Sequence, residues 1–123
     1  MKEEYIKLIL PLPISINKAY AWYRKRHKSD DYKVWYYEAF AKLKEQTEYI
    51  IKWDAWLFVE YNFYTNIYTS KWKRIVDVAN FEKVLSDFLA DNLIWFKDHK
   101  IKRMLLEKHN SQTNYVEIKI KEI

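Results

Sequence analysis

Acidic, amide and lysine side chains recur between residues 77 and 98 at spacings that suit chemistry on phosphate. Asp77 precedes an apolar helical pattern, Asn80 and Lys83 lie in its first two turns, and Asp98 follows it. Carboxylate oxygens are the ligands that Mg²⁺ prefers, and a nearby lysine neutralises negative charge that develops on phosphate. The segment therefore predicts a site in which a divalent metal works on phosphate.

A helix and a short return strand are the elements that must bring these side chains together. Asp77 is a good N-cap residue, and Asn92 can end the helix. Residues 93–96 are apolar and aromatic, which favours a short strand that leads to Asp98. Apolar residues at i, i+3, i+4, i+7 and i+8 predict the buried face of the helix: Phe81, Val84, Leu85, Phe88 and Leu89.

The rest of the chain predicts a single α+β domain over residues 1–123. A mixed β-sheet of about four strands packs with two helices, in the order strand-helix-strand-helix-strand-strand. The strand at 56–64 has apolar side chains on both faces and is expected either in the centre of the sheet or at an interface. The other predicted elements are strands at 5–10, 101–108 and 115–121, a helix that begins at Ser29 or Asp30 and ends with Ile50–Ile51, and a hairpin loop at 110–114.

Two sequence motifs stand in a characteristic order. From Asp77 to Lys83 the chain reads Asp-x-x-Asn-x-x-Lys, and Asp87 and Asp98 follow in the middle of the helix and after the next turn. Near the start, residues 10–17 read Leu-Pro-Leu-Pro-Ile-Ser-Ile-Asn, typical of a strand that enters a proline-rich turn. Together, and at these separations, the motifs resemble the RusA-type Holliday junction resolvases.

The resemblance implies a role for each matching residue. Asp77 and Asp98 would be metal ligands, and Lys83 would be the catalytic cation. Asn80 and Asp87 would support the site, Asp87 by orienting Lys83 through an i, i+4 ion pair. In the alternative, Asn80 bonds the backbone at the helix N-terminus and the Lys83–Asp87 pair is an ordinary surface pair. The resemblance also implies Mg²⁺ or Mn²⁺ as cofactor, four-way junction DNA as substrate and a homodimer, whose two sites could cut opposing strands of a two-fold symmetric junction.

The chain departs from the family pattern at two positions. Ala79 stands where the family has its second metal-binding Asp, and Lys97 replaces the first member of a late Asp-Asp pair. Loss of a carboxylate weakens the binding of a hard cation, so three interpretations stay open: a variant site, an impaired protein, or a copy altered to prevent cleavage. Glu82 lies near Ala79 in sequence and is a candidate for a replacement ligand, but helical spacing is expected to turn it away from the flank that carries Asn80 and Asp87, which disfavours that role.

Basic residues form two blocks that flank the predicted site in the sequence. The net charge of +5 and the pI of about 9.2 favour a polyanionic partner. Residues 15–28 predict a loop in which cationic and aromatic side chains alternate, as suits a DNA backbone and exposed bases; in the alternative, the aromatics fold back onto the core. The predicted DNA contacts are Asn17, Lys18, Arg24, Lys25, Arg26, Lys28, Lys71, Lys73 and Arg74.

Composition and absent motifs exclude several classes of protein. The chain has no Cys, which excludes a disulfide framework and a zinc-cysteine site. No apolar run approaches the roughly 20 residues of a membrane span, and the first residues lack the order of a signal peptide. We therefore expect a cytoplasmic protein with no membrane partner. The absence of a nucleophile motif, a phosphate-cradling loop and a dinucleotide fingerprint argues against hydrolase triads, NTPases, dehydrogenases and a nucleotide cofactor.

Three functional hypotheses follow. The first is a Mg²⁺-dependent endodeoxyribonuclease that resolves four-way junctions in recombination and repair, encoded by a phage or prophage in a bacterial host. The second is a junction-binding protein that does not cleave, because Ala79 replaces a ligand. The third is a basic structural protein of a phage without a site. Metal dependence separates the first two, because binding alone would depend mainly on salt.

Overall fold

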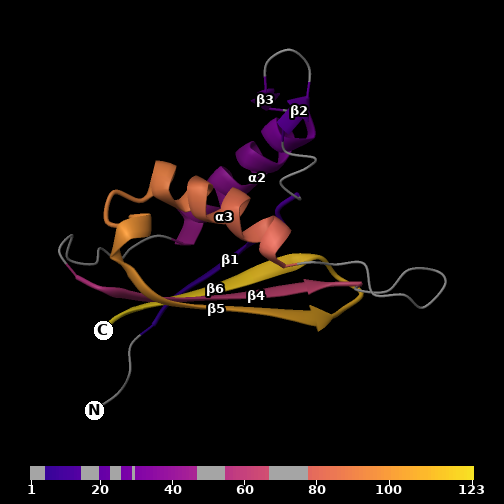
Figure 1. Cartoon of the computed structure of the whole chain (residues 1–123). Coiled ribbons are helices and arrows are strands. Elements are labelled where there is room, and N and C mark those ends of the chain that lie inside the picture. Colours follow the sequence, from indigo (N-terminus) through magenta and orange to yellow (C-terminus); the bar gives the residue numbers. More distant parts are fainter. Residues whose placement is uncertain (1–4, 15–19, 23–25, 29, 47–54, 67–77) are drawn as a thin grey trace.

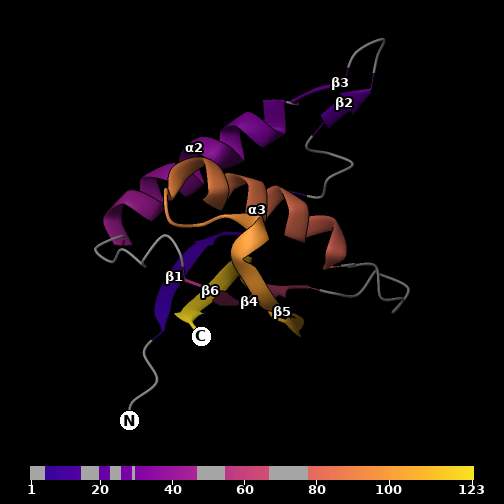
Figure 2. The same cartoon turned by 60° about the vertical axis from the view of Figure 1, so that its left-hand side comes forward.

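A four-stranded mixed sheet forms the base of the molecule, and two helices cover one of its faces (Figures 1 and 2). The computed structural model describes residues 5–14, 20–22, 26–28, 30–46, 55–66 and 78–123, and for 20–22 and 26–28 it describes the backbone alone. This arrangement confirms the predicted α+β class. The elements are β1 (Ile6–Pro11), α2 (Asp30–Gln46), β4 (Leu57–Thr65), α3 (Ala79–Asn92), the 3-10 turn η1 (Asp98–Lys100), β5 (Ile101–Asn110) and β6 (Tyr115–Glu122).

The strand order is β1-β6-β4-β5, so β4 lies inside the sheet, as predicted. β6 pairs antiparallel with both β1 and β4, and Ile6 of β1 faces Ile120 of β6. β4 and β5 are parallel. A parallel pair needs a long crossover connection, which here contains α3. Because α3 lies in this connection, the topology places α3 beside the start of β5.

The core lies between the sheet and the helices. Every second residue of β4 points into it: Leu57, Val59, Tyr61 and Phe63 are all fully buried. The predicted stripe of α3 is confirmed, since Val84, Leu85, Phe88 and Leu89 are buried and Phe81 packs against the core from its rim. The two helices meet where the rings of Trp35 and Phe88 approach edge to face, with centroids 5.2 Å apart.

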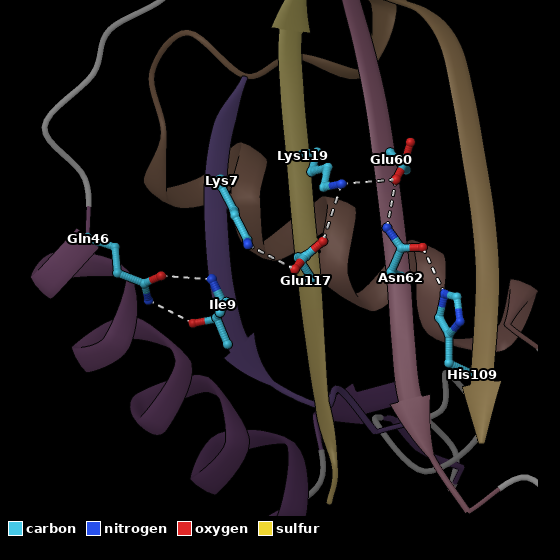
Figure 3. A network of polar contacts seen from close by, with 8 residues as sticks. All are labelled: Lys7, Ile9, Gln46, Glu60, Asn62, His109, Glu117 and Lys119. Atoms are coloured by element: carbon cyan, nitrogen blue, oxygen red, sulfur yellow. Dashed lines mark hydrogen bonds and ion pairs between the residues drawn. The ribbon is translucent and has the colours of Figure 1, made fainter. Parts of the chain in front are cut away.

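Polar side chains cross the opposite face of the sheet in a connected row (Figure 3). Lys119 bridges Glu117 at 3.6 Å and Glu60 at 4.0 Å. Asn62 donates to Glu60 at 2.8 Å and accepts from His109 Nε2 at 2.9 Å. Each of these strands thus carries apolar side chains toward the helices and polar side chains away from them.

The outer edge of β1 is partly occupied by a side chain from α2. The Ile9 N–H donates to Gln46 Oε1 at 2.7 Å, and Gln46 Nε2 donates back to the Ile9 carbonyl at 2.7 Å (Figure 3). These are the two bonds that a neighbouring strand would make at Ile9. Because an open strand edge invites pairing with other chains, Gln46 protects β1 at this point.

The segment after α3 differs from its prediction. Residues 93–96 form a turn rather than a short strand, closed by a bond from the Phe96 N–H to the Leu93 carbonyl at 3.0 Å. Leu93, Trp95 and Phe96 are buried. Their side chains anchor the turn in the core. The aromatic-rich composition of this segment, which usually favours a strand, therefore reflects burial.

Three further segments correct or limit the predicted elements. Residues 110–114 connect β5 to β6, but these strands do not pair because β4 lies between them, so the predicted hairpin is wrong. The predicted loop at 15–28 contains a short antiparallel hairpin, β2 (Tyr20–Trp22) and β3 (Arg26–Lys28). α2 begins at Asp30 as predicted, whereas its predicted end at Ile50–Ile51 lies outside the described residues. None of the helices in the described part of the chain is long and apolar enough to cross a membrane.

Candidate active site

Charged side chains from α3 and η1 line a pocket beside the first half of β5. Its volume is about 380 Å³, roughly the share of a dozen water molecules at ~30 Å³ each. A hydrated cation together with a phosphate group fits within such a space. The lining consists of Glu82, Lys83, Ser86 and Asp87 of α3, Asp98 of η1, and Ile101 and Met104 of β5.

The helical repeat of α3 places its four lining residues in two adjacent rows. Glu82 and Ser86 are one turn apart, as are Lys83 and Asp87, and residues four apart are neighbours on a helix surface. Lys83 Nζ lies 3.4 Å from Asp87 Oδ2. The predicted i, i+4 pair is therefore present, and it holds the ammonium group at the pocket.

The first turn of α3 begins directly after the last residue that lies outside the described part of the chain. Val78 stands at the N-cap position of α3 with helical dihedral angles (φ −63°, ψ −25°) and makes no side-chain cap bond, whereas the predicted N-cap residue Asp77 lies outside the described residues. The Val78 carbonyl accepts from the N–H groups of Phe81 and Glu82 at 3.0 and 3.1 Å. α3 begins at Ala79, which is exposed.

The buried turn after α3 positions Asp98. The C-cap residue of α3 is Leu93, and the buried aromatic residues that follow fix the path of the backbone. Asp98 then opens η1, whose Lys100 N–H donates to the Lys97 carbonyl at 3.0 Å. The Asp98 side chain is exposed and lines the pocket. A carboxylate distant in sequence from Lys83 and Asp87 thereby reaches the same pocket.

A buried tyrosine of the sheet contacts the pocket lining through Ser86. Tyr61 Oη lies 2.9 Å from Ser86 Oγ. Burial raises the pKa of the Tyr61 hydroxyl well above its usual range; the Ser86 bond lowers this pKa, and the charges of Glu82, Asp98 and Asp87 raise it further. The phenol is therefore a neutral hydrogen-bonding group, and three carboxylates from two elements act on it.

The structure brings together some of the predicted site residues. Lys83, Asp87 and Asp98 share the pocket, whereas Asn80 lies in the first turn of α3 and is not part of the lining. Arg26 and Lys28 belong to β3, where the backbone alone is described. The other predicted site residues lie outside the described residues, and their roles stay predictions: Asp77, Asn17, Lys18, Arg24, Lys25, Lys71, Lys73 and Arg74.

Glu82 is the acidic residue that sequence reasoning placed wrongly. It was expected to turn away from the flank of Asp87, but both residues line the pocket. The pocket lies over the boundary between the two rows of α3, so it receives side chains from both. Ser86, one turn after Glu82, contacts the buried Tyr61, so the row of α3 that carries Glu82 faces the sheet beside the pocket, a tertiary contact that the sequence does not reveal.

The donor chemistry of the pocket fits a divalent cation, although its described residues do not close a coordination shell. Glu82, Asp87 and Asp98 offer carboxylate oxygens, which are the ligands of Mg²⁺ and Mn²⁺. Within the described ranges, no three acidic or histidine side chains stand close enough to hold one ion as they lie. The predicted ligand Asp77, two residues before α3, would add a further carboxylate.

Comparison with protein families gave one match over almost the whole chain. The model of the family described as "Endodeoxyribonuclease RusA" matches residues 11–121. The match includes every element that lines the pocket. No curated protein matched the chain.

Proposed function

Because the chain belongs to the RusA endodeoxyribonuclease family, we propose that it resolves four-way DNA junctions by metal-dependent hydrolysis of phosphodiester bonds. The observation that carries the proposal is the pocket in which Lys83, Asp87 and Asp98 meet. These residues occupy the positions at which the family pattern has its lysine and acidic residues. The proposed setting is recombination and repair of phage or prophage DNA in a bacterial cytoplasm.

Lys83 would act on the phosphate directly. Its ammonium group is held at the pocket by Asp87 and can neutralise charge that develops on the phosphate or on the leaving oxygen. Asp87 is thus a positioning residue, because it fixes the direction of a long and otherwise flexible side chain. Ser86 and Tyr61 hold the wall from which Lys83 projects.

Asp98 and Asp77 would hold the divalent cation. Such a cation supplies charge neutralisation for the phosphate oxygens and a more acidic water molecule for attack. Mg²⁺ usually keeps several water molecules and needs few carboxylates, which suits an open, polar pocket. Mn²⁺ takes the same oxygen ligands and would serve in its place.

We propose that two copies of the chain act together as a homodimer. A four-way junction is two-fold symmetric, so paired cuts need two identical sites related by the same symmetry. Sedimentation velocity at micromolar concentration would test this proposal. A purely monomeric protein that still makes paired cuts would contradict it.

A junction-binding protein that does not cleave is the second candidate, and Ala79 is the observation that favours it. The exposed first residue of α3 has no carboxylate where the family pattern has one. Without that ligand, the cation could bind too weakly for turnover. The chain would then recognise junctions through its basic residues alone, with affinity that depends on salt.

Cleavage of a synthetic four-way junction tests both candidates. The protein and its Lys83→Ala and Ala79→Asp variants would be compared in Mg²⁺, with a linear duplex of the same sequence as control substrate. We expect the junction alone to be cut and Lys83→Ala to slow cleavage about a hundredfold. The control variant Lys42→Ala removes another exposed lysine of a surface ion pair, with Glu45 at 3.7 Å, and should cleave normally.

Binding measured in chelator separates the outcomes. If Ala79→Asp alone cuts while both proteins bind the junction, the second candidate is correct. If the unaltered chain cuts, the first is correct. If neither protein binds the junction better than the duplex, junction recognition is refuted for this chain.

A further inference from the structure

Ala79 and Glu82 stand on the same side of α3, one turn apart. Residues i and i+3 of a helix are surface neighbours. Helical side chains also lean toward the helix N-terminus, so a long side chain covers the turn before its own Cα. The carboxylate of Glu82 therefore extends from its own position back toward the turn that Ala79 opens.

The charges of the pocket are unbalanced. Its lining has three carboxylates and a single ammonium group, and that ammonium group is paired with Asp87. Among the ion pairs of the described residues, none involves Glu82 or Asp98. Two carboxylates from different elements thus line one polar pocket with no compensating cation among the residues that the structure describes, and a divalent ion, which takes carboxylate oxygens, would neutralise both.

We propose that Glu82 supplies the carboxylate ligand that Ala79 cannot, so that the cation is held by Glu82 together with Asp98. The inference rests on the proposed function and assigns the site a ligand one turn further along α3. Residue 79, where the family pattern has its ligand, and Glu82 lie on the same face of α3, and Glu82 lines the pocket. The glutamate side chain is longer than an aspartate side chain, and its greater reach compensates for its position one turn further along α3.

A purely structural role for Glu82 makes a different prediction. An acidic residue in the first helical turn interacts favourably with the partial positive charge of the helix N-terminus. In that case Glu82→Gln would change stability slightly and leave metal affinity unchanged. Metal affinity measured without DNA is therefore the deciding readout.

Titration of the protein with MnCl₂ in a calorimeter tests the assignment. We expect Glu82→Gln to weaken Mn²⁺ binding about tenfold or more, because affinity for hard cations follows the number of charged ligands. Asp91→Asn removes an exposed carboxylate of the same helix that does not line the pocket, and should bind Mn²⁺ normally. Adding Ala79→Asp to Glu82→Gln should restore most of the lost affinity, because the two positions serve the same ion.

The variants also distinguish failure of this inference from failure of the proposed function. If Glu82→Gln binds Mn²⁺ normally while Asp98→Asn does not, the metal site exists without Glu82 and the inference is wrong. If the unaltered protein binds no Mn²⁺, or if Asp98→Asn also binds Mn²⁺ normally, both this inference and the proposed metal-dependent mechanism are wrong. Near-ultraviolet circular dichroism of each variant would show that the fold is retained.

Discussion

The hydrogen bond between Tyr61 and Ser86 links the sheet to α3 at the wall of the pocket. Its oxygen atoms lie 2.9 Å apart, Tyr61 is fully buried and Ser86 is 3% exposed. Tyr61→Phe removes one hydroxyl group and leaves the packing of the ring in place. Ser86 Oγ is then buried without that partner, and an unsatisfied buried hydroxyl costs about 1–3 kcal/mol. We expect the free energy of unfolding to fall by about 1–2 kcal/mol.

A double-mutant cycle measured by urea unfolding isolates this bond. Ser86→Ala should cost a similar amount, because it leaves the phenol unpaired instead. The double variant leaves neither group unpaired, so its loss should be smaller than the sum of the single losses by about 1 kcal/mol. Tyr37→Phe is the matched control: Tyr37 is 73% exposed, and its loss should stay within about 0.5 kcal/mol.

Two results would refute the reasoning. If the single losses add to the double loss within about 0.3 kcal/mol, the two hydroxyl groups do not interact in solution. If Tyr61→Phe unfolds like Tyr37→Phe, the Tyr61 hydroxyl contributes nothing. The dependence of the free energy on urea concentration should be the same in all variants, because each exposes the same surface on unfolding.

Three further predictions concern pH, the sheet edge and Lys83. Because the pKa of Tyr61 is raised by burial, the folded state keeps a proton that the unfolded state loses above about pH 10. Stability should therefore fall above that pH, by up to about 1.4 kcal/mol per pH unit from this group, and urea unfolding of Tyr61→Phe should lack that part of the slope. Gln46→Ala removes two bonds of 2.7 Å to β1 and should cost about 1 kcal/mol in urea and increase light scattering on heating, unlike Glu45→Ala. Lys83→Ala should change the free energy of unfolding in urea by less than about 0.5 kcal/mol, because its pair with Asp87 is exposed, although we expect the same variant to slow cleavage.

Local periodicity predicted the parts of the fold that depend on one buried face. The alternation in β4 and the stripe of α3 both appear in the structure, because each repeats the geometry of its own element. The same repeat placed Lys83 and Asp87 in contact. The family pattern then selected Asp98 among several acidic residues, and the structure brings it to the same pocket.

Features that depend on packing between distant segments were not predictable in this way. Residues 93–96 have the composition of a strand, yet their side chains fill the core from a turn. Glu82 joins the pocket because η1 and β5 approach α3 on that side, which helical spacing alone does not reveal. The contact of Gln46 with Ile9 likewise joins two elements whose sequences carry no sign of it.

The order of the strands has a consequence for how the protein folds during synthesis. β6 lies between β1 and β4, although it is the last strand along the chain. Until a ribosome has made residues 115–122, β1 and β4 lack their shared neighbour, and the inward-facing side chains of both remain exposed. Pairing between such distant segments is slow, and exposed strand edges promote aggregation. The sheet therefore has to assemble after translation of β6, and products that end before it should be insoluble.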